Sequence, residues 1–195
     1  MYSQEHIEQL CSGAIGVLAA DTIYGVVARA LDAAAVERVY QVRGRRPEKP
    51  CIILISGVDS LHQFGVEPDA STQQILAKLW PGPYSVVLDA PSSEWSYLHR
   101  GTKTLAFRVP ANEDLRQLLV QTGPLIAPSA NPEGMKPAAT IEKAREYFSD
   151  SVDFYDDAGI RPGEASTVVR IQEGAATVLR QGAAMLPSEI PHTTA

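Results

Sequence analysis

Four cations are concentrated in one short stretch of an otherwise acidic chain. Residues 43–50 read Arg-Gly-Arg-Arg-Pro-Glu-Lys-Pro, whereas the 195 residues together carry a formal net charge of −6. Arginine suits phosphate because its planar guanidinium binds two oxygens at once and keeps its charge. The stretch lies between a helical pattern and a buried-strand pattern, so it is a loop on a rigid scaffold, where binding sites tend to occur. We predict an anion site that includes Arg43, Arg45 and Lys49; a solvated basic loop is the alternative.

Strand-like and helix-like patterns alternate around this loop. Hydrophobic residues make up 45% and charged residues 21%, which is typical of one globular domain at this length. Helices are expected over 3–12, 33–42, 71–80, 113–122 and 141–148. Strands are expected over 14–20, 26–28, 51–55, 84–88, 104–109, 125–127, 166–171 and 175–180, the last two as a hairpin. The alternation predicts a single α/β domain with a mixed sheet between helices. Residues 91–101 are expected to form a loop.

Several classes of function are disfavoured by what the sequence lacks. It contains no GxxxxGK[ST], GxGxxG or GxSxG motif, and its four histidines lie outside the candidate site loops. Cys11 and Cys51 form no CxxC pair and are both expected to be buried, so no metal site is predicted. No apolar run is long enough to cross a membrane, and polar residues 1–13 do not resemble a signal peptide, so we expect a cytoplasmic protein.

Five polar loops each follow or open a predicted strand. They cover residues 21–25, 43–50, 129–134, 163–167 and 180–182. Ligands of open α/β sheets bind where loops leave the strand ends, so these loops would form one cleft if they lie on the same side. Such a cleft would suit a polyphosphate. Its cations would be Arg43, Arg45, Lys49 and Arg180, and its neutral donors Ser129, Asn131, Ser166 and Thr167.

Seven short motifs follow one another in these and neighbouring segments. They are Ala20-Asp21-Thr22-Ile23-Tyr24-Gly25, Val39 to Pro50, Trp80-Pro81-Gly82-Pro83, Ala106-Phe107-Arg108-Val109-Pro110, Ala127-Pro128-Ser129-Ala130-Asn131, Ser166-Thr167-Val168-Val169 and Leu179-Arg180-Gln181-Gly182. Together they cover about residues 13 to 182, nearly the whole chain. Their sequences and order resemble the YrdC-like family of threonylcarbamoyl-AMP synthases.

The resemblance implies a fold and a reaction. The fold would be a single-domain twisted mixed sheet with a cationic concave cleft, formed by residues 1–183 and followed by a flexible tail, 184–195. The reaction would condense L-threonine, bicarbonate and ATP to threonylcarbamoyl-AMP and pyrophosphate. Mg²⁺ would be carried by the ATP phosphates. The product would serve N6-threonylcarbamoyladenosine formation in tRNA. The implied partners are tRNA-modification transferase proteins or tRNA itself, and no membrane is involved. Positioning and charge neutralisation would carry catalysis.

The resemblance also implies roles for individual residues. Catalytic roles fall to Arg43 and Arg45, and threonine binding to Thr22, Tyr24 and Ser129. An aromatic lid over the core is the alternative for Tyr24, and for Arg108 we favour an ion pair on the sheet over a ligand role. ATP and its phosphates would be bound by Arg43, Arg45, Lys49, Ser129, Asn131, Ser166 and Arg180.

Departures from the family pattern leave other functions open. Ala20 replaces a threonine, Arg43 a lysine, Glu133 a hydroxyl residue and Arg170 an aspartate, and Arg46 displaces a proline. The alternative is a divergent YrdC-like protein that binds a nucleotide or RNA without synthase activity. A pure RNA-binding module is a third reading, but no Phe, Tyr or Trp lies between residues 42 and 64 to stack on bases.

Overall fold

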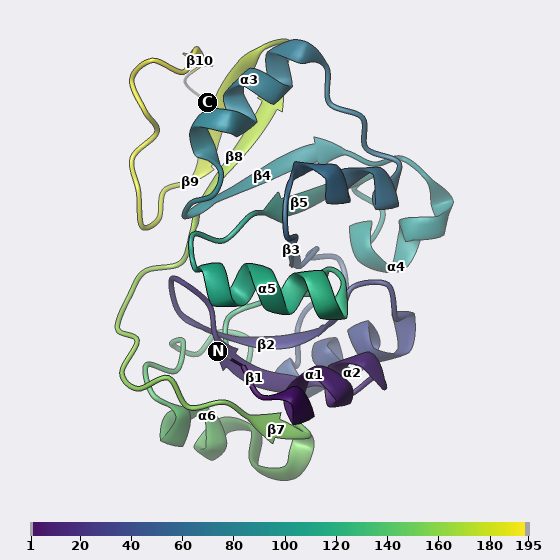
Figure 1. Cartoon of the computed structure of the whole chain (residues 1–195), viewed down its shortest axis with the longest axis vertical. Coiled ribbons are helices and arrows are strands. Elements are labelled where there is room, and N and C mark those ends of the chain that lie inside the picture. The colour runs from purple at the N-terminus through teal and green to yellow at the C-terminus, as the bar shows by residue number, and fades with distance from the viewer. Residues whose placement is uncertain (1, 194–195) are drawn as a thin grey trace.

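A mixed sheet of ten strands runs through the computed structural model, which describes residues 2–193 (Figure 1). The strand order is β10-β9-β8-β4-β5-β3-β6-β2-β1-β7. In Figure 1 the strands turn strongly from one end of the sheet to the other, so the sheet is twisted. The strands are β1 (Gly16–Ala19), β2 (Tyr24–Arg29), β3 (Ile52–Leu54), β4 (Tyr84–Asp89), β5 (Thr104–Arg108), β6 (Leu125–Ile126), β7 (Phe154–Tyr155), β8 (Thr167–Gln172), β9 (Ala175–Arg180) and β10 (His192–Thr193).

The pairing of the strands confirms the predicted mixed sheet. β3 is parallel to β5 and β4 is parallel to β8, whereas β4 and β5 are antiparallel. β8 and β9 form the predicted antiparallel hairpin. The central strands β3, β4, β5 and β8 stand side by side in register, with Ile52 and Val87 both opposite Ala106, and Arg170 opposite Val87. These residues therefore lie in one row across the sheet.

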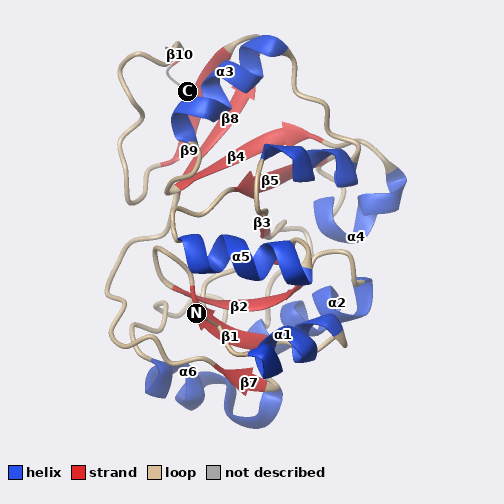
Figure 2. Ribbon diagram, in the orientation of Figure 1, coloured by secondary structure: helices blue, strands red, loops and turns tan. Residues whose placement is uncertain are grey.

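Helices flank this sheet (Figure 2), and five of the six described α-helices begin at a polar residue whose side chain caps them. Asp32 accepts hydrogen bonds from the N–H groups of residues 34 and 35, and Asn112 accepts one from residue 115. Such caps satisfy N–H groups that have no partner in the first helical turn. The α-helices are α1 (Gln4–Cys11), α2 (Ala33–Arg43), α3 (Ala70–Leu79), α4 (Ser96–His99), α5 (Glu113–Thr122) and α6 (Ile141–Phe148), and the 3₁₀ helices are η1 (Val58–Phe64), η2 (Ser93–Trp95) and η3 (Ser149–Ser151).

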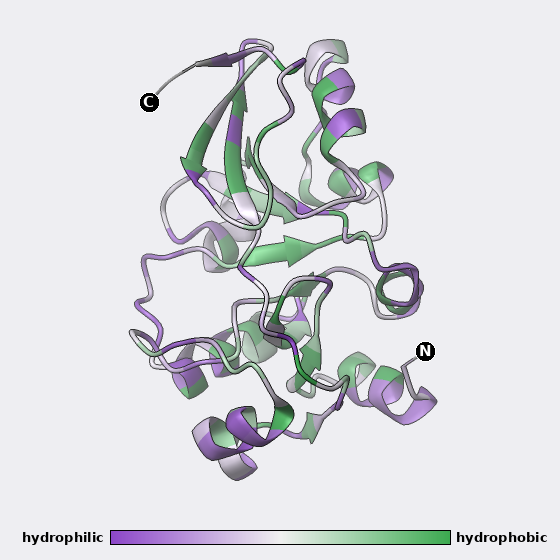
Figure 3. Ribbon diagram, turned by 90° about the vertical axis from the view of Figure 1, so that its left-hand side faces the viewer, coloured by the Kyte–Doolittle hydropathy of each residue, from purple (hydrophilic) through white to green (hydrophobic). Residues whose placement is uncertain are grey.

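Two hydrophobic clusters hold the helices to the sheet. The larger includes Ile53 and Phe107 from the strands with Leu76 of α3, and the smaller includes Leu54 with Leu115 of α5. Because residues 53 and 54 are neighbours in one strand, their side chains point to opposite faces. The helices therefore cover both faces, and Figure 3 shows hydrophobic strands in the interior with hydrophilic outer helix surfaces.

Three local expectations differ from the structure. Residues 91–101 contain η2 and α4 rather than a plain loop, because Trp95 packs on Phe64 and the Tyr97 hydroxyl donates to the Ala30 carbonyl. The two-residue strands β7 and β10 are too short to give a sequence pattern. Cys11 is exposed, not buried: α1 turns its Ile7 and Leu10 side inward, and Cys11 follows one position further round the helix.

The segment after Gly182, expected to be a flexible tail, packs against the sheet as far as the structure describes it. Ile190 is buried, and the Tyr84 hydroxyl donates to the Met185 carbonyl at 2.7 Å. β10 then pairs in parallel with β9. Residues 194 and 195 of the predicted tail lie outside the described residues. No helix within residues 2–193 has the length and apolar character needed to cross a bilayer.

Candidate active site

One cavity of about 490 Å³ opens on the sheet where the five polar loops meet. Its floor is apolar and comes from one face of the central strands, because alternate residues of a strand share a face. Every one of the five loops contributes at least one residue to the walls, so the predicted convergence of the loops is confirmed. The floor residues include Ile52, Leu54, Val87, Ala106 and Val168.

Most of the predicted site residues line this cavity, but not all of them do. Those in the walls are Thr22, Tyr24, Arg45, Ser129, Ser166 and Arg180. Arg43, Lys49 and Asn131 lie outside the lining. Sequence reasoning did not place Arg108, Arg170, Thr102 and Thr104 in the site, although they also line it. Two features of the sequence pointed to these positions: Arg170 stands where the family pattern has an aspartate, and Arg108 lies in one of the seven motifs.

Arginines supply all the formal charge in the lining. Within the described chain, the lining contains Arg45, Arg108, Arg170 and Arg180 but no Asp or Glu. Three of them each pair with a carboxylate that lies outside the lining: Arg108 with Asp21, Arg170 with Asp89 and Arg45, more loosely, with Glu133. Within residues 2–193, no group of three or more His, Cys, Asp or Glu side chains could hold a metal ion.

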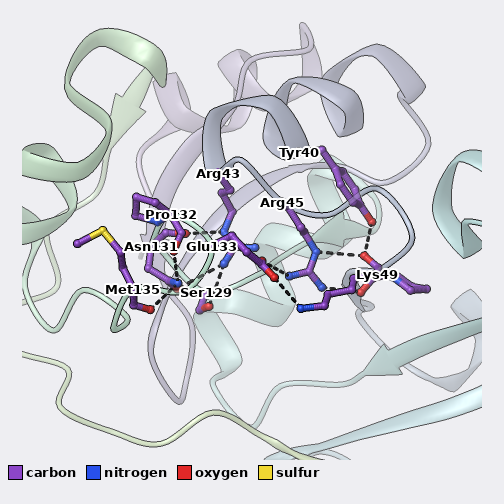
Figure 4. A network of polar contacts seen from close by, with 10 residues as sticks. Tyr40, Arg43, Arg45, Lys49, Ser129, Asn131, Pro132, Glu133 and Met135 are labelled. Atoms are coloured by element: carbon purple, nitrogen blue, oxygen red, sulfur yellow. Dashed lines mark hydrogen bonds and ion pairs between the residues drawn. The ribbon is translucent and has the colours of Figure 1, made fainter.

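Arg43 lies beneath the cavity wall rather than in it. It ends α2, and only 2% of its surface is exposed. Its Nε donates to the Asn131 carbonyl at 2.9 Å, and its Nη2 reaches Ser129 Oγ at 3.3 Å and Asn131 Oδ1 at 3.4 Å (Figure 4). Burial lowers the pKa of Arg43 to about 10, so it is still a cation at neutral pH. Its remaining nitrogen, Nη1, is buried without a hydrogen-bond partner.

The Ser129 to Met135 loop is held in a fixed shape by its own asparagine. Asn131 Nδ2 donates to the carbonyls of Pro132 and Met135, both at 2.8 Å. The Ala130 N–H donates to the Tyr24 carbonyl, which ties the start of the loop to β2. Asn131 therefore organises the loop that carries Ser129 into the cavity wall.

Arg45 is directed into the cavity by the way α2 ends. Gly44 adopts a left-handed conformation with φ 56°, and the Arg45 N–H returns to the Tyr40 carbonyl. The Arg45 guanidinium donates to the carbonyls of Lys49 and Pro50, at 3.1 and 2.8 Å. Lys49 in turn directs its ammonium to Glu133, 2.6 Å away (Figure 4). The cationic loop is thus folded upon itself and fastened to the Ser129 to Met135 loop.

Another part of the wall contains a buried ion pair of Arg108, as the sequence predicted. Arg108 is 3% exposed, pairs with Asp21 and donates to Thr22 Oγ1 at 3.0 Å. Burial lowers its pKa, and the Asp21 charge acts against that shift. Arg108 therefore fixes the position of the Thr22 hydroxyl at the cavity.

Tyr24 lines the cavity, but its hydroxyl is hydrogen-bonded to residues outside the lining. Its side chain is buried, and its hydroxyl donates to the Gly159 carbonyl at 2.8 Å and accepts from the Ala158 N–H. Burial raises the pKa of this hydroxyl. The ring thus packs in the core, while its oxygen anchors the segment that leads to β8.

Ser166 and Arg180 meet at the end of the C-terminal hairpin. Ser166 Oγ lies 2.7 Å from Ser85 Oγ, and Arg180 Nη2 donates to the Ser166 carbonyl at 2.8 Å. A Cβ atom at Gly182 would collide with the Ala165 carbonyl oxygen, so only glycine allows this close approach. Burial, together with the nearby charge of Arg45, lowers the pKa of Arg180. Two cations from different loops are therefore held near each other at one cavity.

Comparison with known proteins gives the same family as the motifs. Residues 8–182 match the family model Sua5_yciO_yrdC, described as "Telomere recombination". The "Threonylcarbamoyl-AMP synthase" of Pyrococcus abyssi is 32% identical over 164 residues, which are 83% of this chain and 48% of that protein. This chain therefore spans about half the length of that relative. The protein of the same name from Idiomarina loihiensis is 31% identical over 80% of this chain and 86% of its own length.

A solved structure agrees with these sequence matches. The crystal structure of P. abyssi Sua5 complexed with L-threonine superposes with a TM-score of 0.87 at 28% identity. The match covers 97% of this chain and 58% of that one. The family model and the superposition each cover most of the chain, including the five loops around the cavity. The chain belongs to the Sua5/YciO/YrdC family.

Proposed function

We propose that this chain is an L-threonylcarbamoyladenylate synthase, which condenses L-threonine, bicarbonate and ATP and releases pyrophosphate. The observation that carries the proposal is the convergence of five polar loops on one cavity whose only charged lining residues, within the described chain, are arginines. An apolar floor with cationic walls suits a nucleotide, because the base needs an apolar surface and the phosphates need cations. The names of the relatives and the threonine complex of the P. abyssi protein support the same substrates.

The triphosphate binds at the part of the cavity wall that carries Arg45 and Arg180, which both line the cavity. Their positive charges act on each other, and an anion that contacts both relieves the repulsion between them. Arg43 supports this end from beneath the wall, because its guanidinium holds the Asn131 carbonyl and Ser129 Oγ. Lys49 adds a further cation at the rim. Asn131 and Ser166 hold the two loops that complete this end.

L-Threonine binds at the part of the cavity wall that carries Thr22. The Thr22 hydroxyl is held by Arg108, and Ser129 faces the same cavity, so both offer hydroxyl groups to a small polar substrate. The Tyr24 hydroxyl is already bonded on both sides, so Tyr24 shapes the cavity wall and leaves no hydroxyl for the substrate. Fixed donors of this kind position the substrate amine without a covalent step.

The reaction follows from positioning and charge neutralisation. The threonine amine and bicarbonate give a carbamate with loss of water, and a carbamate oxygen then attacks the α-phosphorus of ATP while pyrophosphate leaves. Arg43 and Arg45 stabilise the charge that develops on the phosphate oxygens. Mg²⁺ would neutralise the leaving pyrophosphate; it would be held by phosphate oxygens and water, because the cavity lining offers no carboxylate.

The product would be consumed by a transferase that acts on an adenosine of tRNA, so the partners are tRNA-modification proteins in the cytoplasm. The test is pyrophosphate release from ATP, measured with and without L-threonine and bicarbonate. The proposal predicts release only when both are present. Equal release in their absence, or ATP binding without any release, would point instead to a divergent nucleotide-binding member of the family.

A further inference from the structure

Glu133, on the Ser129 to Met135 loop, places a carboxylate beside two cations of the 43–50 loop. Its Oε1 lies 2.6 Å from Lys49 Nζ, and its Oε2 lies 3.9 Å from Arg45 Nη1 (Figure 4). The Glu133 N–H donates to the Arg43 carbonyl at 2.8 Å, which fixes the backbone at this position. The side chain is three-quarters buried, with 25% of its surface exposed. Glu133 is therefore a held group and not a mobile surface carboxylate.

This carboxylate occupies the contacts that an anionic ligand would need. Arg45 Nε and Nη2 donate hydrogen bonds to carbonyls of the loop that carries Arg45. The third guanidinium nitrogen, Nη1, faces Glu133. Lys49 Nζ directs its hydrogen bond to Glu133 as well. The hydrogen bond from Lys49 holds the pKa of the Glu133 carboxyl below its usual range, so the group is ionised at neutral pH. A protein anion thus neutralises cations at the rim before any ligand arrives.

We propose that the Glu133 carboxylate competes with polyphosphate for Lys49 and Arg45, and that this competition sets the affinity of the cavity for polyphosphate. The phosphate chain reaches Lys49 Nζ and Arg45 Nη1 only by displacing the Glu133 carboxylate. This proposal deepens the proposed function, because it concerns the phosphate end of the same site. It makes the ligand's own charge a condition for binding, since a neutral or weakly charged molecule cannot compete for a cation that is already paired.

The test measures binding of inorganic tripolyphosphate by isothermal titration calorimetry. Glu133→Gln keeps the shape of the side chain and removes its charge, so the variant should bind tripolyphosphate about fivefold more tightly than the wild type. Glu133→Ala should show the same direction. Glu146→Gln is the matched control, because Glu146 forms a Lys143 pair of the same 2.6 Å length on α6, outside the cavity lining. It should leave the affinity unchanged.

A double-mutant cycle tests whether the competition is for Lys49. In a Lys49→Met background, Glu133→Gln should give a clearly smaller gain than in the wild type. Weaker or unchanged tripolyphosphate binding in both Glu133 variants, with unchanged melting temperature, would overturn the proposal and make Glu133 a positioning residue for Lys49. Absence of tripolyphosphate binding in every variant would overturn it too. The assay contains no ATP, threonine or bicarbonate, so its outcome is separate from the pyrophosphate-release test of the synthase.

Discussion

Replacing Arg43 by methionine should destabilise the protein, because the guanidinium is the main link between α2 and the Ser129 to Met135 loop. The substitution removes three hydrogen bonds from a buried cation to Asn131 and Ser129. Such hydrogen bonds to a charged group contribute about 1.5–3 kcal/mol each to the free energy of unfolding. The methionine variant no longer has to bury a charge, and this gain offsets several kcal/mol of the loss. We expect a net loss of about 2–3 kcal/mol, because polar atoms of the loop are left without partners.

That loss corresponds to a melting temperature about 4–12 °C lower in a domain of this size. Circular dichroism during thermal unfolding measures it directly. Arg46→Met is the matched control, because Arg46 is an exposed arginine three positions away, and its melting temperature should be within about 1 °C of the wild type. If Arg43→Met also melted within about 2 °C of the wild type, Arg43 would not hold the loop, and the reasoning from its burial would be refuted.

Three further predictions concern other parts of the molecule. Arg45→Ala should weaken ATP binding by about tenfold or more in calorimetry, while the melting temperature falls by no more than about 4 °C; intact affinity with a larger fall would make Arg45 structural. For Asp153, burial alone would raise the pKa, but hydrogen bonds from Arg38 and a backbone N–H outweigh it and hold the pKa below its usual value. Because the folded-state pKa is lowered, Asp153→Asn should cost stability at pH 7, and the difference from wild type in urea unfolding should shrink towards about pH 3; a constant difference would contradict this. Gly182→Ala should lower both melting temperature and ATP affinity because the new methyl group collides with backbone, whereas Gly57→Ala, which meets nothing within 4 Å, should leave ATP affinity unchanged.

Much of the fold could be predicted because burial and periodicity are local in sequence. The continuous apolar runs around residues 17 and 53 gave β1 and β3, and the cap at Asp32 gave the start of α2. The polar loops could also be found, because each interrupts such a run. Local patterns do not show which distant residues an element packs or pairs with. The segment that contains η2 and α4 is held in part by the contact between Trp95 and Phe64, and β10 forms by pairing with the edge of β9.

The candidate site could be predicted as a set of loops but not atom by atom. Charge in the 43–50 loop identifies a cationic segment, yet it does not say that Arg43 turns under the wall while Arg45 turns into the cavity. That difference arises from the left-handed Gly44, which reverses the chain between them. Glu133 stood out only as a charge in an unusual place; its pairing with Lys49, across 84 positions of sequence, required the fold.

Synthesis of threonylcarbamoyl-AMP is tested most directly by the transfer of label from bicarbonate into that product. The protein is incubated with ATP, Mg²⁺, L-threonine and ¹³C-bicarbonate, and the nucleotides are examined at once by mass spectrometry. We expect a threonine-containing AMP adduct that carries one ¹³C, and we expect Arg45→Ala to abolish it. If ATP binds in the cavity but no labelled adduct forms, the protein is not a synthase and the proposed reaction is contradicted.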